Sequence, residues 1–194
     1  MGLHITGDEQ ADRVLTDDPF ALLVGMLLDQ QYPMEHAFRG PAKILDRFGT
    51  LDPATIAAAD PEEFAVMAST PPAIHRYGRS MAGRVQTLAQ IVVDTYGGRA
   101  ERLWTEASSG ADLVARVVAL PGFGKQKAQI FTALLAKQLD VRPEGWEQAV
   151  GDYAEDGHRS VADVVDPASL QKVRDFKKAQ KAAGKAAAEA AVPE

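Results

Sequence analysis

Residues 120–128, LPGFGKQKA, join two segments whose apolar residues recur at helical spacing. The segments at 111–120 and 128–139 each place apolar residues three and four positions apart, which is the pattern of one buried face of an α-helix. Gly122 and Gly124 lie between them, and Phe123 is the only bulky side chain between these glycines. We therefore predict a hairpin of two helices over residues 111–139.

The turn of this hairpin has the chemistry of an anion site. Glycine has no Cβ, so Gly122 and Gly124 can take positive φ and let the backbone approach a ligand closely. The first N–H groups of the following helix lack intrahelical partners, and the helix dipole favours a negative charge there. Lys125 and Lys127 add positive charge. We expect these four residues, with Phe123 between them, to contact a phosphate group.

This stretch resembles the LPGxGxxxA hairpin of the helix-hairpin-helix-GPD superfamily, the base-excision DNA glycosylases that include endonuclease III, the adenine glycosylase MutY and the alkylpurine glycosylases. The resemblance implies an all-α, two-lobed fold and double-stranded DNA as the partner. It also implies hydrolysis of the N-glycosidic bond of a damaged or mispaired base. An ordinary helical corner with a glycine cap is the other interpretation.

Composition indicates an ordinary globular chain: 194 residues, 46% hydrophobic and 25% charged, with no cysteine. No apolar run approaches the ~20 residues that span a bilayer, and the first residues lack signal-peptide order, so we expect a cytoplasmic monomer that binds no membrane. Without cysteine there is no thiolate zinc site and no iron–sulfur cluster, so the cluster that several relatives carry must be missing. We expect no metal and no cofactor, except a monovalent cation between hairpin and DNA, as relatives show.

The net charge of −6 is unevenly distributed along the chain. Residues 73–138, which contain the hairpin, hold 9 Lys and Arg against 4 Asp and Glu, a local balance of +5. The electric field at the contact surface governs phosphate binding more than the net charge of the whole chain does. The negative net charge therefore lowers the expected DNA affinity without excluding DNA binding.

A second resemblance lies in residues 18–31, DPFALLVGMLLDQQ. The aspartate and proline are a helix-start signal, and the apolar run predicts a buried central helix from Pro19 to about Gln31. The segment resembles the DPFxxLVxxxLxQQ opening of the same superfamily, in which a Gln enters the gap left by a flipped nucleotide. Such filling offsets an unstacking cost of a few kcal/mol. Either Gln30 or Gln31 does this, or both amides only cap the helix end.

Between these two segments, cap and turn signals predict short helices and no strand-like alternation appears, so the chain is predicted to be all-α. A segment leading into a helix at 85–96 resembles the superfamily's basic helix and contains Arg76, Arg79 and Arg84. These arginines either contact DNA phosphates or are solvated and paired with acids.

Glycosylase chemistry requires a carboxylate that stabilises the developing positive charge on the sugar and orients water. In relatives an Asp in a Val-Asp-Thr/Ser-His setting follows the hairpin, and that setting is absent here. The matching position is Glu144. Either Glu144 is the acid, or Asp140 or Asp152 takes its role through a shifted loop, or the chain has no glycosylase chemistry.

Strand cleavage requires a different group. Glycosylases that also cut at the abasic site use a Lys two places after the second hairpin glycine as an amine nucleophile. Gln126 occupies that position, and Lys125 and Lys127 beside it point to other sides of the helix. We therefore predict a monofunctional enzyme, or none.

These features divide the chain into a polar N-terminal segment at 1–18, the helical region at 19–150 and a loop with a C-terminal helix at 151–194. Residues 172–185 hold six basic residues and one acid, and we expect this end to fray, with a non-specific DNA arm as the alternative. Two other functions remain open: a catalytically silent DNA-structure-binding protein and a helical protein-interaction domain.

Overall fold

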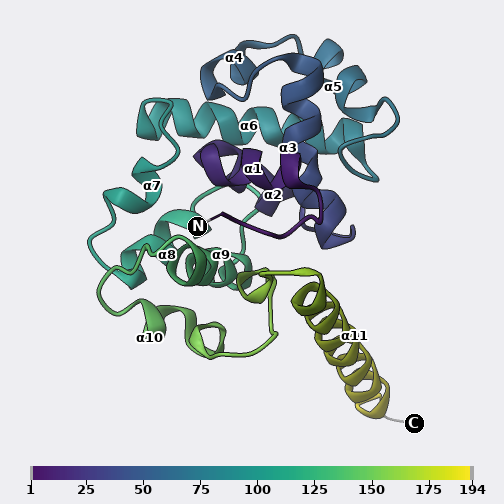
Figure 1. The fold of residues 1–194 in the computed structure, drawn as a ribbon, viewed down its shortest axis with the longest axis vertical. Coiled ribbons are helices and arrows are strands. Elements are labelled where there is room, and N and C mark those ends of the chain that lie inside the picture. Colours follow the sequence, from purple (N-terminus) through teal and green to yellow (C-terminus); the bar gives the residue numbers. More distant parts are fainter. Residues whose placement is uncertain (1, 193–194) are drawn as a thin grey trace.

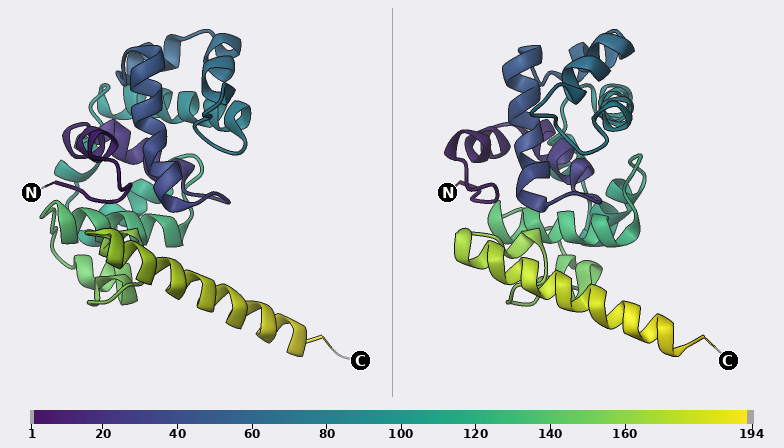
Figure 2. Two further views of the ribbon diagram at one scale, coloured as in Figure 1. Left: turned by 45° about the vertical axis from the view of Figure 1, so that its right-hand side comes forward. Right: turned by 90° about the vertical axis from the view of Figure 1, so that its right-hand side faces the viewer.

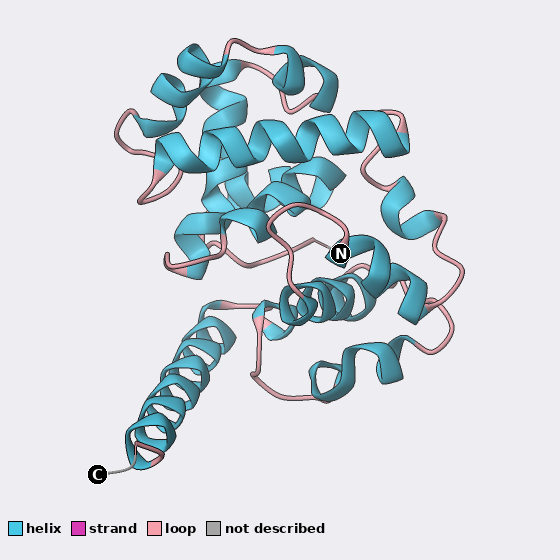
Figure 3. Cartoon of the chain, turned by 180° about the vertical axis from the view of Figure 1, so that it is seen from behind, coloured by secondary structure: helices cyan, strands magenta, loops and turns pink. Residues whose placement is uncertain are grey.

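The computed structural model describes residues 2–192, which form eleven α-helices, two short 3-10 helices and no strand. Helices from the first half of the chain gather in one lobe and those from the second half in another (Figure 1). Seen from behind, only helices and connecting loops are present in the part of the chain that is described (Figure 3). The predicted all-α, two-lobed fold is confirmed.

The first lobe is built around α2, which is buried on almost every side, as its continuous apolar run predicts. Its helices are α1 (Glu9–Asp17), α2 (Pro19–Leu28), α3 (Met34–Phe48), α4 (Pro53–Ala58), α5 (Pro61–Ser69) and α6 (Gly78–Tyr96).

The second lobe contains the hairpin and the elements that follow it. The short helix α7 (Arg102–Thr105) leads into it, and its helices are α8 (Gly110–Val118), α9 (Lys125–Gln138), α10 (Trp146–Val150), η1 (Gly151–Ala154), η2 (Val161–Asp163) and α11 (Pro167–Ala190).

Local sequence signals account for most helix ends. The Asp18 side chain accepts hydrogen bonds from the Phe20 and Ala21 amides, and Pro19 takes the first helical position, where no N–H is needed. Gly49 ends α3 in the left-handed conformation with φ 89°. Asp166 caps α11 through a capping box with Ser169.

Helix α2 is shorter than its sequence pattern predicts. It ends at Leu28, because Asp29 leaves the helical region with φ −75° and ψ 66°. Gln30 and Gln31 therefore lie in the turn between α2 and α3 rather than on a helix. This turn lies at the junction of the lobes, next to the hairpin.

Helices extend further toward both ends of the described chain than the sequence patterns predict. The polar segment 1–18 contains the helix α1, and the buried Asp12 carboxylate accepts hydrogen bonds from the Ile5 and Thr6 amides and the Thr6 hydroxyl. Helix α6 also begins earlier than predicted, at Gly78 rather than at residue 85. Helix α11 continues past Gly184 to Ala190, and its C-terminal half projects beyond the other helices (Figure 2).

Among residues 2–192, no helix combines the length and the apolar character that crossing a membrane requires.

Candidate nucleic-acid interface

The hairpin is formed by α8 and α9, and its two glycines have different surroundings. Gly122 has φ +83°, and a Cβ built on it would lie 2.8 Å from Cδ1 of Leu27 on α2. Gly124 is extended, with φ −82° and ψ 176°, and a Cβ there would meet nothing within 4 Å. Gly122 is thus required where the turn packs against the first lobe, whereas Gly124 leaves open space before α9.

The open space faces the start of α9. No side chain caps this helix, so the amides of its first turn keep free donors at the positive end of the helix dipole. Lys125 is exposed beside them, while Phe123 is only 5% exposed. Phe123 therefore anchors the turn in the core and does not face a ligand. The backbone amides and Lys125 are the exposed part of the anion site that the sequence predicts.

Lys127 is not part of that anion site, contrary to the expectation from its charge. Its Nζ donates to the carbonyl oxygens of Met26 at 2.8 Å and Leu27 at 3.4 Å, at the C-terminal end of α2. Burial lowers the pKa of Lys127 to about 8, and the nearby Asp29 carboxylate partly opposes that shift. The side chain joins the hairpin to the first lobe by binding the carbonyls that a helix end leaves unpaired.

The two glutamines after α2 have separate environments. Gln30 donates through Nε2 to the Leu27 carbonyl at 2.7 Å, and its Oε1 accepts from Arg84 on α6 at 3.0 Å. Gln31 is exposed, has φ 53°, and its side chain has no hydrogen-bond partner among the described residues. A non-glycine residue in the left-handed region costs about 1 kcal/mol. Gln30 caps the helix end, and Gln31 is the free amide beside the hairpin.

His75 supports this turn, a role that no sequence signal indicated. Its Nδ1 accepts from the Tyr77 amide at 3.0 Å, so Nε2 carries the proton and donates to the Gln30 carbonyl at 2.8 Å. Burial lowers the pKa of His75 below its usual value and keeps the ring neutral at pH 7.

The arginines of the basic segment occupy different places. Arg84 contacts Gln30, and Arg76 is exposed next to His75, so both lie near the glutamine turn. Arg79 instead pairs with Glu62 on α5, with 2.6 Å between NH2 and Oε2. Arg79 therefore forms an ordinary exposed surface ion pair.

The structure separates the three candidate acids. Asp140 follows the C-terminal end of α9 and pairs with Arg142 at 3.2 Å. The backbone carbonyl of Glu144 accepts from the Gly110 amide at 2.8 Å, at the start of α8. Both acids therefore lie at the end of the hairpin opposite to the glycine turn.

Asp152 lies on η1, which returns toward the first turn of α9. The hydroxyl of its neighbour, Tyr153, accepts from Gln126 Nε2 at 2.8 Å. Asp152 is exposed, and its carboxylate forms no ion pair with any described residue. Of the three candidates, Asp152 belongs to the element that contacts the first turn of α9, next to the glycine turn.

Two further acids at the lobe junction were missed from the sequence. Asp29 and Glu35 flank the glutamine turn, with side chains only 12% and 7% exposed. Lys177 of α11 lies 3.9 Å from Asp29, and Arg174 of α11 pairs with Glu35. The break in an otherwise apolar run at Asp29 was the available signal. In residues 2–192 no cluster of three or more His, Asp or Glu side chains is arranged to hold a metal ion.

The structure is that of an all-helical, two-lobed protein, with an uncapped helix start and an exposed glutamine amide at the junction of the lobes. Residues 24–192 match the model of the HhH-GPD superfamily base excision DNA repair protein, and the chain belongs to this family, whose proteins bind DNA. The match continues past residue 150, beyond the predicted helical region at 19–150, and includes α11. No curated protein and no solved structure matches the chain.

Proposed function

We propose that the protein is a monofunctional DNA glycosylase, which hydrolyses the N-glycosidic bond of a damaged or mispaired base and leaves the strand intact. One observation carries the proposal: the uncapped start of α9 and the free Gln31 side chain lie at the same junction. Gly122 packs against Leu27, and Lys127 binds the carbonyl oxygens of Met26 and Leu27, so the hairpin and the glutamine turn are held together.

Each part of this junction has a role when a base leaves the duplex. The amides at the start of α9 and Lys125 hold a backbone phosphate, which sets the position of the DNA without reading its sequence. Gln31 enters the space that the extruded nucleotide leaves and offers its amide to the unpaired partner base. Gln30 cannot do so, because Leu27 and Arg84 occupy its side chain.

For the chemical step we propose Asp152 as the carboxylate. It is the candidate acid on the element that contacts the first turn of α9, and it has no countercharge to neutralise it. A carboxylate near the sugar stabilises the positive charge that develops as the bond to the base breaks, and it accepts a proton from the attacking water.

Strand cleavage is not part of the proposed function. An amine nucleophile is needed to form the imine with the abasic sugar. Gln126 carries an amide at the matching position and donates it to Tyr153, and the Lys127 amine is bound to the end of α2. Borohydride reduction in the presence of abasic DNA should therefore trap no covalent complex.

The test is base release from a panel of duplexes with damaged and mispaired bases, detected by alkali cleavage. Once a substrate is found, Asp152→Asn should lower the single-turnover release rate by ~10²-fold or more while DNA affinity changes little. Glu144→Gln and Asp140→Asn are matched charge-removing controls at the far end of the hairpin and should change the rate by less than about threefold. A large loss in either control, with Asp152→Asn unaffected, would show that Asp152 is the wrong acid.

A catalytically silent DNA-structure-binding protein is the second candidate, and one observation favours it. The position that matches the family's acid, Glu144, lies away from the glycine turn. If the wild-type protein binds DNA in a salt-dependent way but releases no base from any duplex in the panel, this second function replaces the first.

A further inference from the structure

The C-terminal half of α11 has no packing partner among the described residues. Ser169 and Val173, in the first two turns, are the buried residues of this helix, and every residue from Lys178 to Ala190 is exposed. Alanine, the strongest helix former, dominates this half and supports the helix without tertiary contacts. The outer half of α11 therefore adds no tertiary packing to the fold.

The basic residues of this helix lie on one face. At about 100° per residue, five of them fall within an arc of about 100° of the helix circumference. We call them the α11 stripe: Arg174, Lys177, Lys178, Lys181 and Lys185. Lys172 lies on the opposite face. Among the described residues, the three outer lysines form one ion pair, the exposed contact of Lys185 with Glu189 at 4.0 Å.

The inner end of the stripe reaches the candidate interface. Arg174 pairs with the buried Glu35, and Lys177 lies 3.9 Å from Asp29, directly before the two glutamines. Since these contacts orient the helix about its own axis, the outer lysines Lys178, Lys181 and Lys185 continue along the face that begins at the glutamine turn.

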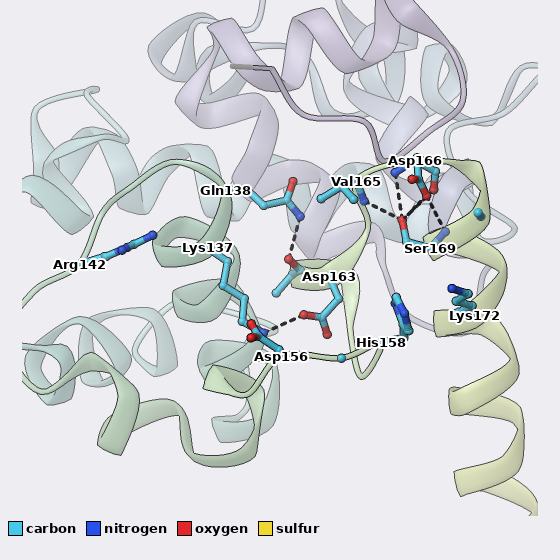
Figure 4. Close-up of a pocket in the computed structure, with 13 residues that line it drawn as sticks. Lys137, Gln138, Arg142, Asp156, His158, Asp163, Val165, Asp166, Ser169 and Lys172 are labelled. Atoms are coloured by element: carbon cyan, nitrogen blue, oxygen red, sulfur yellow. Dashed lines mark hydrogen bonds and ion pairs between the residues drawn. The ribbon is translucent and has the colours of Figure 1, made fainter.

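The base of α11 is also fixed in place. A polar pocket of about 450 Å³ lies between the end of α9, the η2 segment and the start of α11 (Figure 4). Lys137 pairs with Asp163 at 2.7 Å there, and Gln138 donates to three carbonyl oxygens of the segment that precedes α11. The Ser169 hydroxyl accepts from the Val165 amide at 2.9 Å. These contacts set the direction in which α11 leaves the second lobe.

The composition of the outer half selects the kind of partner. Between Lys178 and Ala190 the apolar side chains are all alanines, so the helix has no large residue to insert into a protein groove or a lipid layer. The outer half instead presents a row of lysine ammonium groups, in which Lys178 and Lys185 are about 10 Å apart along the helix axis. A regularly spaced polyanion fits this row, and the stripe is continuous with the surface that we propose to face DNA.

We propose that the α11 stripe binds the phosphate backbone of the duplex flanking the lesion, as an arm that lengthens the DNA contact. The proposal rests on DNA binding at the junction of the lobes, but not on base release there. The arm touches neither the reacting sugar nor the acid, so it governs affinity and its salt dependence and leaves the rate of the bound complex unchanged.

The experiment measures affinity, as a function of salt, for a duplex with a stable abasic-site analogue. It uses the full chain and two duplexes, a short one and one longer by about one helical turn on each side, ~10 base pairs. The variant is the triple substitution Lys178→Gln, Lys181→Gln and Lys185→Gln. On the long duplex its slope of log affinity against log salt should fall in magnitude by about 2–3, since each phosphate contact contributes about 0.9. Affinity at low salt should drop roughly tenfold or more, and the short duplex should show less change.

A matched control keeps the composition and the charge. It exchanges the three lysines with alanines on the opposite face: Lys178→Ala, Lys181→Ala and Lys185→Ala together with Ala179→Lys, Ala183→Lys and Ala187→Lys. Helix content by circular dichroism should match the wild type, because the same residues are only reordered. Affinity on the long duplex should fall as it does in the triple glutamine variant.

The outcomes separate this proposal from the proposed function. If the wild type binds DNA but the glutamine variant keeps the wild-type affinity and salt slope, the proposed DNA contact of α11 is refuted, and the proposed hairpin interface is unaffected. Wild-type affinity in the exchanged variant would show that charge anywhere on the helix is sufficient, which overturns the oriented stripe. If no base is released but the glutamine variant binds long DNA weakly, the glycosylase proposal fails and the arm stands. Absence of DNA binding by the wild type overturns both.

Discussion

At the scale of single residues, identical side chains in one helical turn have opposite surroundings. Lys125 is exposed at the uncapped start of α9, whereas Lys127, two positions later, binds the carbonyl oxygens of Met26 and Leu27. The α-helix turns by about 200° between these positions, so one points to solvent and the other to the first lobe. Charge alone therefore does not identify a phosphate contact.

The two lysines should respond differently in DNA binding. Lys125→Gln should reduce the salt slope of DNA affinity by about 0.9, because one phosphate contact is lost. Lys127→Met should leave the slope unchanged, since its ammonium is occupied at the end of α2. The measurement is affinity for one duplex over a series of salt concentrations, after circular dichroism has shown that both variants fold. Equal losses of slope would contradict this assignment.

At the scale of the element, the hairpin uses its two glycines for different purposes. Gly122 combines positive φ with a close approach to Leu27, so it serves folding. Gly124 is extended and borders open space, so it leaves the first amides of α9 accessible. We expect the same sequence pattern to contain one glycine that serves folding and one that serves DNA binding.

Substitution should separate these two roles. Gly122→Ala should lower the free energy of unfolding by about 1–3 kcal/mol, from the left-handed backbone and the contact with Leu27. Gly124→Val should cost less than about 1 kcal/mol, because its extended backbone suits a β-branched residue and a Cβ there meets nothing within 4 Å. It should nonetheless weaken binding to all duplexes alike, by about tenfold or more, since it obstructs charge-assisted hydrogen bonds to the phosphate.

Denaturant unfolding and DNA titrations on both variants provide the check. Gly124→Ala, which adds a single methyl group, is the control for a small change at the same position. Full affinity in a folded Gly124→Val protein would show that the amides of α9 do not hold a phosphate.

At the scale of the whole molecule, α11 connects the second lobe to the first. Arg174 extends from α11 to Glu35 on α3, whose Oε2 is buried without a hydrogen-bond partner. A buried carboxylate needs a countercharge, so this pair fixes α11 across the junction next to the glutamine turn.

Breaking the pair from one side should be costly. Arg174→Met leaves Glu35 buried and uncompensated, and the free energy of unfolding should fall by about 1–3 kcal/mol. The double variant Arg174→Met, Glu35→Gln should recover part of this loss. Lys178→Met, an exposed position one turn further along the same face, is the control and should change stability by less than about 0.5 kcal/mol. Urea unfolding checks all three, and equal stability of Arg174→Met and Lys178→Met would disprove the contact.

Much of the fold could be predicted from the sequence, because helix ends depend on neighbours in the chain. Such signals act within a single helical turn, so the sequence predicts them directly: Asp18 with Pro19, Gly49, and Asp166 with Pro167. The hairpin at 111–139 was predictable for the same reason. Helix α1 was not predicted, although the Asp8 side chain caps its start by accepting from the Ala11 amide and Ala11 and Leu15 form its buried face. That face packs against α2 and α3.

The site required the tertiary structure. By itself the sequence determined which residues are candidates for the site: two glutamines, two glycines, two lysines and a set of acids. Only the structure decided that Gln31 is free while Gln30 is bound, that Lys127 is buried while Lys125 is exposed, and that Glu144 lies at the far end of the hairpin. These distinctions depend on contacts between residues distant in the chain, such as Lys127 with Met26. Burial and charge pairing across such distances are set by how the lobes pack, which no local pattern encodes.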